Sequence, residues 1–195
     1  EFVKLMNKKA GEIGAVNTNF VTPNGLDAKG HFSTAYDMAL IGAYAIKNQQ
    51  FLKITNTKSY SFYDCSNKRH IVVNNKDAFL NMSSDAIGIK TGFTGDAGYC
   101  FVGAVKSNNR VYVSCVLASG WPPNKTYKWR DTTKLMDYGK NNFDTKKILK
   151  NRISFPVNIE NGTKKQIIAV AIGPYKALVS RNDTVEAKTE VNYEL

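Results

Sequence analysis

The sequence has no apolar run of the roughly 18 residues that a membrane-spanning helix needs, so no transmembrane segment is expected. Only five of its 195 residues are proline and 43% are apolar, which favours a globular chain over a disordered one. The opening EFVKLMNKKAGEIG also lacks the basic head, apolar block and cleavage site of a signal peptide. We therefore expect an internal portion of a longer chain, with one well-buried domain and a small second one.

Cysteine and histidine are scarce as well. Three cysteines, Cys65, Cys100 and Cys115, cannot all pair within the chain, and no C-x-x-C motif occurs. We expect all three to be buried thiols, with no disulfide needed, although Cys100 and Cys115 could approach across a hairpin. The two histidines, His31 and His70, are too isolated to suggest zinc. Neither a metal nor a cofactor is predicted.

Acidic residues are few beside the basic ones. The balance of 27 Lys and Arg against 16 Asp and Glu gives a formal charge of +11, which favours polyanionic neighbours. An anionic cell wall, an anionic membrane surface and nucleic acid all qualify. Because the basic residues are scattered and no recognition-helix or RNA-binding signature accompanies them, nucleic acid is not the expected partner.

The first third of the chain reads as two helices separated by a loop. Apolar residues recur at helical spacing over residues 2–13. Residues 17–31 are rich in Asn, Pro and Gly and predict a structured loop, in which we expect His31 to form a loop-fixing hydrogen bond and not to act as a base. A second helix is expected to begin at Thr34, which can form a capping box with Asp37.

The middle of the chain predicts strands. Alternation indicates a hairpin over residues 58–74, and a short helical piece is expected near 77–82. Three further strands are expected, over 86–92, 98–106 and 110–118. The last two are nearly continuous in apolar residues, as in central strands covered on both faces, and an Asn-rich tight turn joins them.

A break at Pro122-Pro123 precedes another predicted helix, with Trp129, Leu135, Met136 and Tyr138 expected to face inward. Beyond Asp144 the helix pattern disappears. Short strand-like pieces follow, ISFPVNI, KQIIAVAI and KALVS, separated by Asn-Gly and Gly-Pro turns. We expect residues 144–195 to form a small all-β domain, truncated at its end because 184–195 supplies no obvious closing strand.

The segment GIKTGFTGDAGYC, residues 88–100, is the candidate for chemistry. Gly92 has no Cβ at a point where another backbone could lie alongside, so a peptide-like ligand could pair with this strand as an added edge. Lys90 and Thr91 would supply a cation and a hydroxyl for a carboxylate or a proton transfer. Spacing alone also fits a plain edge strand with a bulge and a solvated lysine.

KTGFTGDAGYC, preceded by MNKKAGEIGAVNTNFVTPNGLD and HFSTAYDMA, strongly resembles the low-molecular-weight penicillin-binding proteins, the serine D-Ala-D-Ala carboxypeptidases. The likeness runs from Phe2 to about Phe143, so residues 1–143 are expected to be the C-terminal portion of that catalytic domain. It implies an α+β fold of the penicillin-binding and β-lactamase type, an antiparallel sheet packed with helices, followed by the small all-β domain. It also implies an extracytoplasmic enzyme whose substrate is a peptidoglycan pentapeptide and which β-lactam antibiotics acylate.

The resemblance also implies roles for single residues. Lys90 would support proton traffic, Thr91 would bind the terminal carboxylate, and Gly92 and the backbone N–H of Phe93 would line the substrate and oxyanion site. The family has an arginine after the third strand that helps to bind that carboxylate. Here Lys128 stands in its place, and Arg130 follows two residues later.

The chain departs from the family in lacking S-x-x-K, since no serine has a lysine three positions later. We expect the nucleophile and the S-x-N triplet to precede Glu1, on a segment of the same protein that would be this chain's partner. Ser107-Asn108-Asn109 fits the triplet's letters but follows K-T-G in a hairpin turn, so it is rejected. The chain alone is predicted to be inactive. Two other readings stay open, a non-catalytic peptidoglycan-binding protein and a β-lactamase relative.

Overall fold

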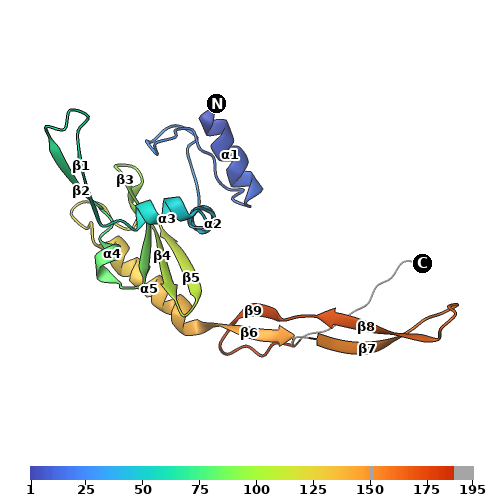
Figure 1. The fold of residues 1–195 in the computed structure, drawn as a ribbon. Helices are drawn as coiled ribbons and strands as arrows, with labels where there is room; N and C mark the ends of the chain where they lie inside the picture. Colours follow the sequence, from blue (N-terminus) through green and yellow to red (C-terminus); the bar gives the residue numbers. More distant parts are fainter. Residues whose placement is uncertain (150–151, 187–195) are drawn as a thin grey trace. The chain divides into compact units, whose positions relative to one another are not determined.

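The computed structural model describes residues 1–149 and 152–186. Contacts within the chain divide it into two compact units, Glu1–Tyr138 and Gly139–Leu195. In the first unit the elements are α1 (Phe2–Glu12), α2 (Ala35–Ala45), α3 (Gln49–Thr55), β1 (Ser59–Tyr63), β2 (His70–Asn74), α4 (Phe79–Met82), β3 (Ala86–Thr94), β4 (Gly98–Ser107), β5 (Arg110–Val116) and α5 (Tyr127–Asn142), the last of which ends beyond the unit boundary (Figure 1).

An antiparallel sheet in the order β3-β4-β5 forms the centre of the first unit. Alternate residues of β4 point to opposite faces, as the period of two in a strand requires. On one face Phe101 and Val105 pack with residues of α4 and α5, and on the other Val102 and Ala104 pack with residues of α2 and α3 (Figure 1). The expected α+β fold, a sheet packed between helices, is confirmed.

The two outer strands differ from β4. β5 was expected to be a central strand, but in the described sheet it lies at one end, and most of its side chains are half-buried. β3 lies at the other end and has β4 as its strand neighbour. The turn between β4 and β5 is the predicted one, with Asn108 and Asn109 at φ of 50° and 60°.

Half of the predicted capping box forms at α2. Thr34 Oγ1 accepts from the backbone N–H of Asp37 at 3.1 Å. The Asp37 carboxylate instead accepts from Asn17 N at 2.7 Å and from Thr18 Oγ1 at 2.8 Å. Aspartate is one methylene shorter than the glutamate usual at this position, and here it bonds the preceding loop. His31 has the expected role in that loop, where its Nδ1 accepts from Val21 N at 3.0 Å.

The hairpin of β1 and β2 was predicted correctly, but every residue of β1 is exposed, so its alternation does not mark a buried face. Asp64 holds the connecting turn, with Oδ1 accepting from Lys68 N at 2.9 Å and from Arg69 N at 3.2 Å. The hydrogen bond from Arg69 N is the main cause that lowers the pKa of Asp64. Cys65, in this turn, is exposed, contrary to the expectation of a buried thiol.

Helix α5 buries a different face from the one predicted. Trp129 and Met136 are buried as expected, but Leu135 and Tyr138 are 45% and 59% exposed. Because an α-helix has about 3.6 residues per turn, Met136 returns to the side of Trp129 after two turns, whereas Tyr138 lies on the opposite side. Lys128 is buried instead.

The second unit contains β6 (Phe143–Leu149), β7 (Arg152–Asn158), β8 (Gln166–Ile172) and β9 (Tyr175–Ser180). They form two antiparallel pairs, β6 with β9 and β7 with β8. The sequence did not predict β6, because its DTKK stretch has no apolar pattern. The proposed truncation concerns residues 184–195, most of which lie outside the described residues. In the described part of the chain, no helix combines the length and apolarity that crossing a membrane requires.

The approach of α2 to the sheet requires a glycine. A Cβ on Gly42 would lie 2.8 Å from Val102 Cγ1 and 3.2 Å from Ile89 Cδ1. We therefore predict that Gly42→Ala lowers the free energy of unfolding by roughly 1–3 kcal/mol, as overpacking does. Gly11→Ala is the control, because no atom lies within 4 Å of its Cβ position and alanine stabilises a helix by about 0.5–1 kcal/mol over glycine. Urea unfolding measures both, and a Gly42→Ala variant as stable as the wild type would contradict this packing.

Candidate active site

The K-T-G residues lie on the strand at the end of the sheet. Lys90, Gly92 and Phe93 are exposed and Thr91 is half-buried. Lys90 Nζ donates to the carbonyl of Thr91 at 2.5 Å, and within the described residues it forms no ion pair. This border of β3 therefore presents backbone and an ammonium group to the outside.

Packing does not explain the glycine at position 92. A Cβ there would lie 3.8 Å from Cys100 Cβ, an ordinary van der Waals contact. Gly98 is different for two reasons. Its φ of +68° is one that other residues rarely adopt, and a Cβ at this position would lie 2.8 Å from the Trp121 ring. Gly92 thus leaves space along β3 that the described residues do not use.

Two residues that the sequence did not single out hold the β3–β4 turn next to this border. Thr94 Oγ1 donates to Asp27 Oδ1 at 2.9 Å, so the loop before α2 reaches the turn. From the other side Trp121 Nε1 donates to the carbonyl of Gly95 at 2.8 Å. Both contacts join segments far apart in the sequence, and no local pattern predicts them.

Of the two basic residues expected after the third strand, Lys128 is the one that the structure brings toward β3. It is 8% exposed, and its Nζ lies 4.9 Å from the centroid of the Tyr99 ring and 4.7 Å from that of Trp129. The Tyr99 ring in turn lies tilted against the Phe93 ring, with 4.5 Å between the ring centroids. Burial lowers the pKa of Lys128, and the Lys90 charge lowers it further.

Arg130 points elsewhere. Its side chain is 58% exposed, its Nε pairs with Asp131 Oδ1 at 3.1 Å, and its guanidinium lies over the Tyr127 ring at 4.5 Å. A hydrogen bond from Ser119 is the main cause that lowers the pKa of Asp131, and Arg130 adds to it. The structure therefore does not bring Arg130 together with Lys90.

Asp77 is a buried acid that the sequence analysis did not single out. It is 2% exposed, and one carboxylate oxygen accepts from Phe79 N at 3.0 Å at the start of α4. Its other oxygen is buried with no hydrogen-bond partner among the described residues. Burial raises the pKa of Asp77 to about 6, opposed in part by hydrogen bonds from backbone N–H groups at the start of α4 and, to a smaller degree, by the charge of Lys128. Only the three-dimensional fold brings α4 next to α5.

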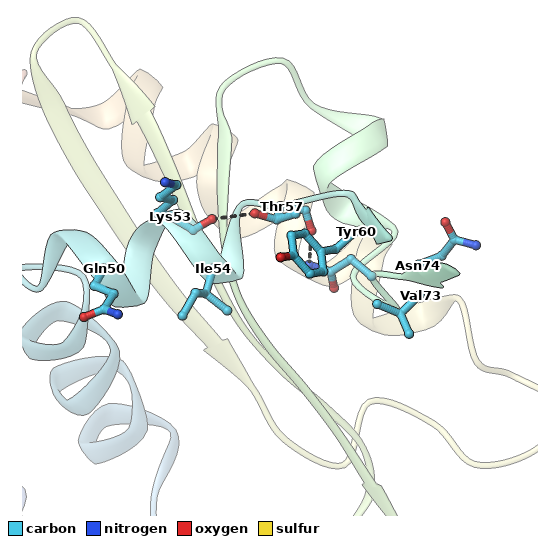
Figure 2. Close-up of a pocket in the computed structure, with 8 residues that line it drawn as sticks. Gln50, Lys53, Ile54, Thr57, Tyr60, Val73 and Asn74 are labelled. Atoms are coloured by element: carbon cyan, nitrogen blue, oxygen red, sulfur yellow. Dashed lines mark hydrogen bonds between the residues drawn. The ribbon is translucent and has the colours of Figure 1, made fainter. Parts of the chain in front are cut away.

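A cavity of about 590 Å³ lies away from this border. Figure 2 shows this cavity between α3 and the β1–β2 hairpin, with Tyr60 beside Thr57. The Thr57 hydroxyl donates a hydrogen bond to the carbonyl of Lys53 at 2.8 Å. The lining of the cavity comes from α3, the following loop and the hairpin, not from β3. Among the described residues, no cluster of His, Cys, Asp and Glu could hold a metal ion.

Comparison with known proteins supports the resemblance. The family model described as D-alanyl-D-alanine carboxypeptidase matches residues 1–120. D-alanyl-D-alanine carboxypeptidase DacF of Bacillus subtilis is 31% identical over 193 residues, which is 98% of this chain and 49% of that protein. DacA of Haemophilus influenzae is 40% identical over 76% of this chain and 36% of its own length.

Solved structures agree on the fold. The Streptomyces K15 DD-transpeptidase superposes with a TM-score of 0.66 at 31% identity, covering 71% of this chain and 53% of that one. DacD of Francisella tularensis has a TM-score of 0.72 over 92% of this chain and 55% of that one, at 22% identity, and supports the fold alone. The chain belongs to the D-alanyl-D-alanine carboxypeptidase family, and it spans about half or less of the length of these relatives.

The raised pKa of Asp77 predicts a pH dependence of stability. The folded protein binds this proton more tightly than the unfolded chain does, so the stabilisation is complete below the ordinary value of 3.8 and is lost as pH rises through about 6. Relative to Asp77→Asn, the wild type should lose roughly 1–3 kcal/mol of unfolding free energy over this interval. Denaturant titrations of both proteins between pH 3.5 and 7.5 test this, and parallel pH profiles would contradict it.

Proposed function

We propose that the protein containing this chain is a serine-type D-Ala-D-Ala carboxypeptidase, which removes the terminal D-Ala from peptidoglycan stem peptides through an acyl-enzyme and is acylated by penicillins. The observation that carries the proposal is the border of β3, where Lys90 and Gly92 are exposed and Thr91 is half-buried. Family membership supports the reaction class.

The chemistry of the border suits a D-Ala-D-Ala terminus. An extended peptide can pair with β3 as an added strand, and Gly92 leaves room for its backbone. In this proposal the Thr91 hydroxyl and the Lys128 ammonium bind the terminal carboxylate, and Lys90 supports proton transfer at the nucleophile. The backbone N–H of Phe93 is proposed as one donor to the oxyanion, a contact that typically contributes about 3–4 kcal/mol in the transition state.

The nucleophile must come from elsewhere, because no serine in this sequence has a lysine three residues later. We propose that a further segment of the same protein supplies S-x-x-K and the S-x-N triplet and completes the cleft beside β3. The charge of +11 suits work at an anionic cell wall or membrane surface. In this proposal the protein acts outside the cytoplasmic membrane, where wall trimming affects cell shape.

The direct test compares the 195-residue chain with the full-length protein. The full-length protein should release D-Ala from a D-Ala-D-Ala peptide and form a stable adduct with fluorescent penicillin, whereas the chain alone should do neither, because it lacks the serine. Peptidoglycan binding without an adduct on the full-length protein would favour a non-catalytic binder. Rapid turnover of penicillin would favour a β-lactamase relative.

Gly92 gives a sharper test of the border. We predict that Gly92→Ala in the full-length protein lowers kcat/KM for the peptide roughly 100-fold, because a methyl group would displace a strand-like substrate by about 1 Å. Stability should stay unchanged or rise by up to about 1 kcal/mol, since the Cβ meets no close atom. Gly95→Ala is the matched control, with no atom within 4 Å of its Cβ position. Equal kinetics for the two variants would exclude pairing along β3 at Gly92.

A further inference from the structure

The segment after β5 reaches across the start of β4 to the β3–β4 turn, next to the K-T-G border. We call residues 119–121 of this segment the strap. We propose that Trp121 is a positioning residue, whose indole fixes the turn and thereby the backbone N–H of Phe93. The inference rests on the proposed function, because that function assigns this N–H to the oxyanion. Trp121 acts here through the turn and does not touch the reacting atoms.

The strap is anchored to two elements of the packed core. Ser119 Oγ donates to Asp131 Oδ2 on α5 at 2.7 Å. Ser119 N donates to the carbonyl of Tyr99 at 2.8 Å, and Tyr99 N donates to the carbonyl of Gly120 at 2.9 Å. Both α5 and β4 contribute side chains to the same apolar cluster. The strap can therefore serve as a fixed support for the turn.

The backbone of this segment has a special conformation. Ala118 has a φ of 52°, in the left-handed region that residues other than glycine rarely adopt. Gly120 has a φ of 91°, and a Cβ there would lie 2.9 Å from the carbonyl oxygen of Asn124. Strain of the kind seen at Ala118 persists only where the surrounding structure imposes it, and it clusters at functional sites.

Trp121 makes the contact between the strap and the turn. Its Nε1 donates to the carbonyl of Gly95 at 2.8 Å. Its ring lies against Gly98, where a Cβ would be 2.8 Å from the ring. Burial alone does not explain this placement, because Trp121 is 44% exposed whereas Trp129 is 8% exposed. What tryptophan adds to an aromatic ring here is a donor directed at one carbonyl of the turn.

The register of the sheet shows which way the N–H of Phe93 points. Phe93 is paired with Tyr99. Opposite residues in an antiparallel pair alternate between hydrogen-bonded and non-hydrogen-bonded pairs. Because the N–H and the carbonyl of Tyr99 both bond to the strap, its pair with Phe93 is a non-hydrogen-bonded one. The Phe93 N–H therefore points away from β4. Gly95, which Trp121 holds, follows Phe93 by two residues, so a shift of the turn moves this N–H.

The test compares Trp121→Phe with the wild type in the full-length protein. Phenylalanine keeps an aromatic ring at this position and removes the donor to Gly95. We expect kcat for a D-Ala-D-Ala peptide to fall roughly tenfold, because a shift of a catalytic group by about 1 Å can cost 100-fold and one lost hydrogen bond should move it less. KM should change less than about twofold, since the oxyanion forms only in the transition state.

Tyr127→Phe is the matched control. The Tyr127 ring also borders the strap, with Cδ2 3.2 Å from the Cβ position of Gly120. The substitution removes only the hydroxyl, and the ring keeps its place under the Arg130 guanidinium, 4.5 Å away. This variant should leave kcat and KM unchanged. A tenfold loss of kcat in Tyr127→Phe as well would show that any disturbance near the strap lowers activity, and it would overturn the role of the indole.

A second readout does not need enzyme activity. Tyr99 N bonds to the strap, and Ala97 N donates to Thr94 Oγ1 at 3.0 Å within the turn. In the full-length protein, a peptide covering residues 94–99 should exchange amide hydrogen for deuterium severalfold faster in Trp121→Phe than in the wild type. Amides of β5, which pairs with β4, are the internal reference and should exchange at the same rate in both.

The outcomes separate this inference from the proposed function. If Trp121→Phe shows only one of the two effects, slower turnover or faster exchange, or neither, the positioning role falls and the proposed function stands. A raised KM with unchanged kcat would instead place Trp121 in substrate binding and overturn the positioning role. If the wild-type full-length protein neither releases D-Ala nor forms a penicillin adduct, the proposed function falls, and the link from Trp121 to the oxyanion falls with it.

Discussion

The pairing of β4 with β3 is the constraint on which the candidate site depends. β4 carries the two apolar clusters, because its alternate residues pack against α4 and α5 on one face and against α2 and α3 on the other. Once Lys90 is paired with Val102 and Phe93 with Tyr99, the K-T-G residues are fixed in register. β3 has β4 as its strand neighbour in the described sheet, and Lys90, Gly92 and Phe93 are exposed along it. A firmly packed sheet thus supplies a rigid border, which is what a peptide needs if it is to pair with it.

Features set by neighbouring residues were predictable from the sequence. The Thr34 cap, the Asn108-Asn109 turn and the strand character of β3 each depend on a few adjacent residues, and all three are present. Burial was harder to predict. The β1–β2 hairpin alternates although every residue of β1 is exposed, and the middle of β6 is the charged stretch DTKK, which has no apolar pattern. In α5 the apolar character of Leu135 and Tyr138 did not predict which residues are buried. The position of each residue around the helix axis did, because it places Thr132 and Met136 on the buried face with Trp129.

The parts of the site that the sequence did not reveal are long-range contacts. Asp27 meets Thr94 across 67 residues, and Trp121 meets Gly95 across 26. Lys128 was singled out by its place in the family pattern, but its burial beside Tyr99 and Trp129 follows from the packing of α5 on the sheet. Sequence pattern alone could not separate Lys128 from Arg130. The direction of each side chain from the helix does so, since one faces the sheet and the other pairs with Asp131.

Asp77 shows how a buried acid can weaken a fold. It is 2% exposed, and one of its carboxylate oxygens has no hydrogen-bond partner among the described residues, so its ionised form weakens the fold above about pH 6. A neutral side chain of the same shape would remove that cost. Lys128 would then lie in a low-dielectric site with another cation near it and no acid to oppose the loss of its proton.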